Sequence, residues 1–199
     1  MSDEPAVILG ERFVAAVALA VELHARQARK GNGLPYLSHP LAVASLVLEH
    51  GGDEDQAIAA LLHDGPEDQG GEATLARIRA QFGDRVAGIV AACSDTFESP
   101  KPPWRARKEA FIARLPAEGP DALLVTLADK VHNARTLVAD VRADGAASLD
   151  RFTGGRAGTV WYYRTLADRL GALEPGPLAT ELAELVGELV AEMEPGAGR

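Results

Sequence analysis

Apolar residues recur every three or four positions along almost the whole chain, which predicts helices rather than strands. The first amphipathic stretch runs from about residue 10 to residue 30 and carries Phe13, Val17 and Val21 on one face. The last runs from 177 to 193 and carries a stripe of Leu, Val and Met. No strand-like alternation and no internal repeat is present. We therefore expect one all-α domain, a compact bundle of about eight to ten helices.

Glycines, prolines and capping residues separate the predicted helices. We expect Ser38 and Asp53 to be N-caps, because such side chains accept hydrogen bonds from the free backbone N–H groups of a helix start. The sequence "EPGP" at 174–177 is typical of a turn. We place one domain over residues 8–173 and assign residues 174–199 to a C-terminal helix with a frayed tail, which packs on the domain or on a partner subunit.

The composition is ordinary for a globular protein, and it limits the cellular compartments and the classes of partner that we expect. The chain has 199 residues, of which 47% are hydrophobic and 25% charged, and its formal charge is −9. This acidity argues against sequence-independent nucleic-acid binding, which needs a basic face. The apolar run from Phe13 to Val21 is too short to cross a bilayer, so we expect a cytoplasmic protein with no membrane partner. The single cysteine, Cys93, fits a reducing compartment.

The segment "LLHDGPEDQG" at 61–70 places four ionisable side chains directly after an apolar run. His63 and Asp64 are adjacent, and Glu67 and Asp68 follow after a Gly-Pro pair. Ionised carboxylates are costly to bury unless a positive group lies among them. A His–Asp pair alone is a weak signal, because a capping Asp beside a surface His gives the same pattern.

Two further residues favour a metal site. Asp129 lies inside the apolar stretch "LLVTLADKVHN", where an acid needs a partner. His39 stands at a predicted helix start in "PYLSHPL", on a connection stiffened by prolines. Two imidazoles and two carboxylates form a mixed nitrogen and oxygen set, which suits Mn²⁺, Fe²⁺ or Zn²⁺ better than Ca²⁺. A dication would also offset the charge of the two carboxylates.

Three stretches, "RKGNGLPYLSHPLAVA", "ALLHDGPED" and "LADKVHNARTL", resemble the HD-domain phosphohydrolases. More closely, they are similar to the hydrolase domain of the RelA/SpoT proteins and to the single-domain small alarmone hydrolases, among them the metazoan SpoT homologue. The resemblance runs from about Phe13 to Leu173 and implies the helical bundle of an HD-type hydrolase domain. It also implies a single Mn²⁺ in each chain, held by His39, His63, Asp64 and Asp129.

The reaction implied by this resemblance removes pyrophosphate from the ribose 3′ position of (p)ppGpp, the alarmone of the stringent response, and leaves GDP or GTP. Glu67 and Asp68 match the acids that handle water and protons, and the sequence leaves open which of them is the base. Asn133, one helical turn after Asp129, matches a position that contacts ligand or water.

Six basic residues are candidate contacts for the charged nucleotide. Each also has a simpler interpretation as part of a solvated helix face or a surface ion pair. Trp161 or Tyr162 could close the pocket, although both aromatics also suit the core. His24, His50 and His132 have no motif support as metal ligands. The six candidates are Arg29, Lys30, Lys101, Arg105, Lys130 and Arg156.

One departure from the family pattern falls inside the predicted site. The family usually has a Thr-Val-like pair where this chain has Gly65-Pro66. Because proline disfavours helix at the preceding residue, we expect the helix of His63 to end there and Glu67 to begin a new turn.

Three alternatives stay open at this point. The same metal site could act on another nucleotide, such as an adenosine alarmone, (pp)pApp, or the 2′-phosphate of NADPH. The chain could instead be a nucleotide-binding HD module without catalysis. The apolar stripe of the C-terminal helix also leaves a homodimer open.

Overall fold

The computed structural model describes residues 8–30, 33–98 and 100–193. Within these ranges the chain forms ten α-helices and two short 3-10 helices, with no strand beyond an isolated bridge between Ala28 and Pro35, so the predicted all-α bundle is confirmed. None of the described helices has the length and apolar character to cross a membrane. The α-helices are α1 (Glu11–His24), α2 (Ser38–Glu49), α3 (Glu54–Leu62), α4 (Gly65–Asp68), α5 (Glu72–Phe82), α6 (Asp84–Cys93), α7 (Trp104–Arg114), α8 (Pro120–Asp144), α9 (Gly155–Leu173) and α10 (Pro177–Ala191), and the 3-10 helices are η1 (Leu115–Ala117) and η2 (Ala146–Arg151).

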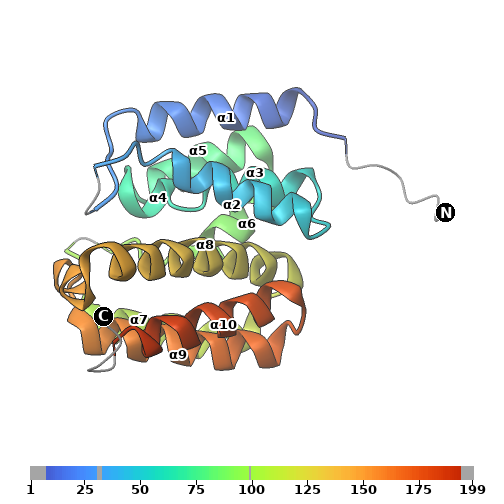
Figure 1. Ribbon diagram of the computed structural model, residues 1–199. Coiled ribbons are helices and arrows are strands. Elements are labelled where there is room, and N and C mark those ends of the chain that lie inside the picture. The colour runs from blue at the N-terminus through green and yellow to red at the C-terminus, as the bar shows by residue number, and fades with distance from the viewer. Residues whose placement is uncertain (1–7, 31–32, 99, 194–199) are drawn as a thin grey trace.

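The helices form two groups that meet at α8 (Figure 1). Helices α1 to α6 lie on one side, and α7, α9 and α10 lie together with α8 on the other. α8 contacts α2, α3 and α6 of the first group and α9 and α10 of its own. With 25 residues it is the longest helix in the described part of the chain, and it forms the wall between the two groups.

Burial from both sides explains the composition of α8. Its apolar side chains Val125, Ala128 and Val131 are fully buried. Asp129 and Lys130 occupy the same stretch and are only 6% and 8% exposed. Charges at this depth are stable only when they have partners, so polar groups of the neighbouring helices must face this part of α8.

One of the two predicted N-caps is confirmed and the other is wrong. Asp53 accepts a hydrogen bond from the backbone N–H of Gln56 at 3.0 Å, and the Gln56 side chain accepts one from the Asp53 N–H at 2.8 Å. Ser38 is already inside α2, and Leu37 occupies the N-cap position. The reason is a tight turn at Pro35, whose carbonyl accepts both the backbone N–H of Ser38 at 3.1 Å and its hydroxyl at 2.9 Å.

The C-terminal helix α10 packs on α8 and α9 of the same chain. Its side chains Leu178, Leu182 and Leu189 are buried there. The division of the chain after residue 173 stays a prediction, and the predicted frayed tail at 194–199 lies outside the described residues.

Replacing Leu182 by Ala should destabilise the protein, because the side chain is fully buried between α10 and its neighbours. We expect the free energy of unfolding in urea to fall by about 2–5 kcal/mol, the usual loss for Leu→Ala in a core. Leu185→Ala is the matched control on the same helix, since Leu185 is only partly buried and should cost less. Equal losses at the two positions would contradict the observed packing of α10.

Candidate functional site

Two consecutive helices, α2 and α3, and the distant helix α8 bring potential metal-binding side chains together. His39 lies in the first turn of α2, His63 follows the last residue of α3, and Asp129 is in the middle of α8. One potential ligand atom from each lies within 4.8 Å of the others. Nε2 of His39 is 3.1 Å from Oδ1 of Asp129, and Nε2 of His63 is 3.6 Å from the same oxygen. Both imidazoles are almost completely buried.

Asp64 joins this cluster from its open side. Its Oδ2 lies 3.1 Å from Nε2 of His63 and 3.4 Å from Nε2 of His39. The side chain is 24% exposed, against 9% for Asp129. The hydroxyl of Tyr36 donates a hydrogen bond to the same Oδ2 at 2.5 Å. The structure therefore places all four ligands implied by the resemblance side by side.

The hydrogen bonds of the two imidazoles leave the right nitrogens free for a metal. Nδ1 of His63 lies 2.8 Å from the carbonyl of Ala60, which accepts only, so Nδ1 carries the hydrogen. Nε2 of His63 is buried and has no hydrogen-bond partner among the described residues. A buried nitrogen without such a partner is unusual in a native protein and fits a metal ligand. Nδ1 of His39 lies 2.8 Å from Nδ1 of His132, which turns Nε2 of His39 toward the carboxylates.

The electrostatics of the cluster favour a bound cation. Burial opposes the charged form of His63, but the carboxylates of Asp64 and Asp129 outweigh it and raise the pKa of His63 well above its ordinary value. Burial also opposes the ionised form of Asp129, yet Lys130 and the two imidazoles hold the pKa of Asp129 well below its usual range. The space between these groups therefore attracts positive charge. Nitrogen and oxygen donors together suit a divalent transition ion, so the cluster fits a divalent metal ion.

Other side chains hold the ligands in place. Nζ of Lys130 lies 2.6 Å from Oδ2 of Asp129, and Nδ2 of Asn133 donates to Oδ1 of Asp129 at 2.6 Å. Arg29 donates in turn to Oδ1 of Asn133 at 3.1 Å. Burial lowers the pKa of His132 to about 4, with help from the neighbouring His39 and Arg29, so its neutral ring can accept the hydrogen of His39. Lys130, predicted to bind substrate, is thus engaged with a ligand of the cluster.

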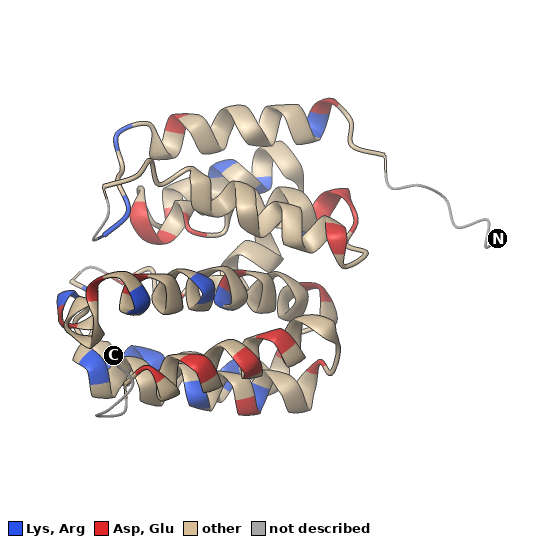
Figure 2. Cartoon of the chain, viewed as in Figure 1, with Lys and Arg blue, Asp and Glu red and all other residues tan. Residues whose placement is uncertain are grey.

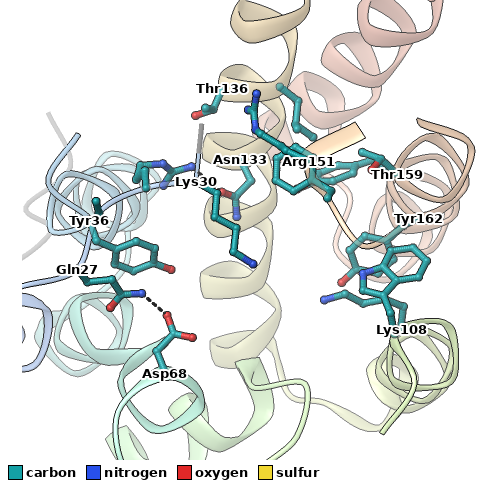
Figure 3. A pocket seen from close by; sticks show the side chains of 16 residues that line it. Gln27, Lys30, Tyr36, Asp68, Lys108, Asn133, Thr136, Arg151, Thr159 and Tyr162 are labelled. Carbon is teal, nitrogen blue, oxygen red and sulfur yellow. Dashed lines mark hydrogen bonds between the residues drawn. The ribbon is translucent and has the colours of Figure 1, made fainter. Parts of the chain in front are cut away.

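A cavity of about 360 Å³ opens beside the cluster. Tyr36 and Asn133 line it, and these two side chains also hold Asp64 and Asp129. Figure 3 shows Lys30 and Lys108 reaching into the cavity from opposite walls. Figure 2 shows basic residues on the connection after α1 near the acidic turn α4, at the left of the view. The aromatic part of the wall consists of Tyr36, Trp104, Phe152, Tyr162 and Tyr163.

The two predicted acids lie on α4 and have different partners. The new turn predicted after Gly65-Pro66 is present, because α3 ends at Leu62 and α4 carries both acids. Glu67 forms an ion pair with Lys101 at 2.9 Å and accepts the backbone N–H of Asp95 at 3.2 Å.

Asp68 lines the cavity and accepts a hydrogen bond from the Gln27 amide at 2.6 Å. Desolvation by the surrounding protein atoms raises the pKa of Asp68, although its side chain is exposed to solvent. This effect outweighs the hydrogen bond from Gln27, and the Asp64 and Glu67 carboxylates add to the rise. Asp68 therefore holds a proton more readily than an ordinary aspartate.

The predicted basic contacts divide into two groups. Arg29 and Lys30 line the cavity, whereas Arg105 and Arg156 do not. Arg105 stacks on the ring of Trp161 at 3.2 Å and pairs with Glu109, and Arg156 pairs with Asp150 at 2.6 Å. Lys101 is held by Glu67 as described. Of the two predicted aromatics, Tyr162 is buried and lines the cavity, and Trp161 packs against the outside of the bundle core.

Sequence reasoning missed four residues that contact predicted site residues or the cavity. Tyr36 stands in the same "PYLSHP" motif as His39, and this proximity was the available signal. His132 lies three positions after Asp129, close to one helical turn, which was the signal for a neighbour of the cluster. Lys108 stands in the same basic stretch as Lys101 and Arg105, and that stretch was its signal. Gln27 carried none, because its contact with Asp68 arises only in the folded chain.

The sequence and the fold have counterparts in known proteins. A cyanobacterial protein of Synechocystis, named as a probable guanosine-3′,5′-bis(diphosphate) 3′-pyrophosphohydrolase, is 38% identical over 130 residues, which are 61% of this chain. The alignment spans only 16% of that longer relative. The Xenopus tropicalis protein MESH1, named guanosine-3′,5′-bis(diphosphate) 3′-pyrophosphohydrolase, is 39% identical over 140 residues, 69% of this chain and 73% of its own.

A solved structure supports the same assignment at the level of the fold. The structure of a metazoan ortholog of SpoT superimposes with a TM-score of 0.75 at 24% identity, over 92% of this chain and 98% of that one. The family model described as HD domain matches residues 16–173. The matched range includes all four potential metal ligands, His39, His63, Asp64 and Asp129. Together with the MESH1 alignment, this match shows that the chain belongs to the HD domain family, in the branch that contains the metazoan SpoT homologue.

Proposed function

We propose that this chain is a Mn²⁺-dependent phosphohydrolase that removes the 3′-pyrophosphate of (p)ppGpp and releases GDP or GTP. The observation that carries the proposal is the buried cluster of His39, His63 and Asp129, with Asp64 on its open side, beside a cavity that basic side chains reach. Relatives that align with this chain are named for the same reaction. The polyanionic substrate suits a site that combines a metal with cations.

The proposed metal ligands are His39, His63, Asp64 and Asp129. When bound, a divalent ion would neutralise charge on the phosphate oxygens and make a water molecule more acidic. The chain itself supplies the orientation of the ligands. Tyr36 and Asn133 each hold one carboxylate by a hydrogen bond, so the donor atoms need little rearrangement when the ion binds.

Proton transfer is assigned to the acids of α4. Asp68 faces the cavity and has a raised pKa, so it can deliver a proton to the departing 3′ oxygen or take one from water. Glu67 is held beside Lys101, and Arg107 lies 3.8 Å away, and we assign this carboxylate to the proton transfer together with Asp68. Asn133 joins the cluster to Arg29 at the cavity wall.

Cations around the cavity provide for the charges of the nucleotide. Lys30 and Lys108 project into the cavity (Figure 3), and Arg29 forms part of its wall. Lys101 would join them once a phosphate competes with Glu67 for its ammonium group. Arg29 and Lys30 match an Arg-Lys pair that lies against the nucleobase in the hydrolase family that this chain resembles.

The purified protein with Mn²⁺ should release pyrophosphate from ppGpp. The assay compares ppGpp, pppGpp, pppApp and NADPH at equal concentration, and we expect the guanosine alarmones to be turned over fastest. The His63→Ala variant, prepared in the same way, shows whether a contaminant causes the signal. Turnover of only pppApp or NADPH would reassign the substrate. If none of the four nucleotides is turned over, the proposed hydrolase activity is refuted.

Removing a proposed ligand should remove the metal. We expect the purified protein to retain a divalent transition ion, measured by mass spectrometry of the metal. In the His63→Ala variant the metal content should fall by more than about tenfold, because the free Nε2 of His63 points into the cluster. The matched control is His50→Ala. His50 is a partly buried histidine whose Nδ1 lies 2.9 Å from the carbonyl of Leu46, outside the cluster. Equal metal content in the two variants would argue against the site.

Neutralising the acids of α4 should separate chemistry from metal binding. We expect Asp68→Asn and Glu67→Gln each to lower kcat by about 10²–10⁴-fold, the usual contribution of general acid–base catalysis, with the metal content unchanged. Both substitutions keep the shape of the side chain. A variant that turns over at the wild-type rate would exclude its acid from proton transfer.

A further inference from the structure

The acids of α4 stand on an element that cannot orient them alone. α4 has only four residues, and one isolated turn is unstable without outside contacts. Pro66 in its first turn removes a backbone donor, and Gly65 adds conformational freedom. The direction of the Asp68 side chain therefore depends on what touches it from neighbouring elements.

The contact comes from the segment just after α1. The amide of Gln27 donates from Nε2 to Oδ2 of Asp68 at 2.6 Å, and Figure 3 shows this bond at the edge of the cavity. Oε1 of Gln27 faces Nδ1 of His24 at 2.7 Å and the amide nitrogen of Gln69 at 3.3 Å.

These three contacts agree on one orientation of the Gln27 amide. An ionised Asp68 only accepts hydrogen bonds, and the amide nitrogen of Gln69 only donates. The NH₂ group of Gln27 must therefore face Asp68, and its oxygen must face Gln69. It follows that Nδ1 of His24 carries a hydrogen and donates it to Gln27.

Gln27 is itself held firmly by its surroundings. Its backbone N–H donates to the carbonyl of His24 at 3.0 Å, and its carbonyl accepts the N–H of Tyr36 at 2.9 Å. His24 is 3% exposed, and its ring packs on that of Tyr36 with the centroids 5.0 Å apart. The Tyr36 hydroxyl in turn holds Asp64. The same short segment thus braces one proposed ligand and one proposed catalytic acid.

We propose that Gln27, oriented by His24, is a positioning residue that aims the carboxylate of Asp68 at the substrate; this inference rests on the proposed function. A neutral amide suits this task, because it fixes the carboxylate without forming an ion pair. Glu67 shows the contrast, since a lysine holds it. Asp68 is then held by a neutral donor, and its carboxylate can still take up or release a proton.

The test uses the full chain and the nucleotide that the wild type turns over fastest. Gln27→Met keeps the length of the side chain and removes all three hydrogen bonds of the amide, to Asp68, His24 and Gln69. We expect kcat to fall about 10- to 100-fold, the range seen when a supporting hydrogen bond or the geometry of a reacting group is lost. KM and metal content should not change. Gln69→Met is the matched control, because Gln69 touches Gln27 from the other side and has no hydrogen bond to Asp68 among those found in the described residues.

A double variant shows whether Gln27 acts through Asp68. In the Asp68→Asn background, adding Gln27→Met should cause no further loss of kcat. A further loss as large as in the wild-type background would mean that Gln27 acts independently, and a loss expressed only in KM would mean that it binds substrate directly. Either result, or a wild-type kcat in Gln27→Met, overturns the inference.

A measurement without turnover keeps this inference separate from the proposed function. In nitrogen-15-labelled protein, the side-chain amide signals of Gln27 should shift when Asp68 is changed to Asn, whereas those of Gln69 should shift less. Unmoved Gln27 signals would refute the hydrogen bond. If the wild type hydrolyses no nucleotide of the panel, the proposed function fails and this measurement still decides the contact.

Discussion

Asp129 carries a negative charge in the middle of a helix that other helices cover on both sides, and the site is organised around that charge. Burial of an unpaired carboxylate is too costly for a marginally stable fold. Lys130 and Asn133 on the same helix and the imidazoles of His39 and His63 from the other group surround it. The need to satisfy one buried acid therefore draws α2, the end of α3 and α8 together.

Much of this arrangement could be predicted from the chain itself. Apolar periodicity predicts the helices, because each helix buries a stripe and the period survives in the sequence. Asp129 in an apolar stretch and His63 at the end of another mark the cluster, since polar side chains in buried surroundings need partners. The true start of α2 could not be predicted, and the expected Ser38 cap was wrong, because a turn at Pro35 takes the Ser38 hydroxyl and the helix starts earlier.

The sequence places Tyr36 and His132 close to predicted ligands along the chain, but it does not predict which side chains they contact. The hydrogen bonds of His132 to His39 and of Tyr36 to Asp64 join residues 93 and 28 positions apart. Such pairs depend on how helices pack, and neither periodicity nor residue type reports the distance between them. The basic candidates show the same limit. Lys108 projects into the cavity while Arg105 of the same helix stacks outside it, although both stand in one basic stretch.

Gly65 and Gln27 have to be considered together. A Cβ atom at position 65 would lie 3.0 Å from Cδ1 of Leu23 on α1, closer than almost all real contacts of that kind. A larger residue there, such as the threonine expected from the family pattern, would therefore press α4 away from α1 unless Leu23 gave way. The glycine leaves room for α4 beside Leu23 of α1, and Asp68 of this turn lies within hydrogen-bond distance of Gln27. Gly65-Pro66 weakens the turn, and Gln27 in the segment after α1 holds the acid that this turn carries, so the two features act on the same carboxylate.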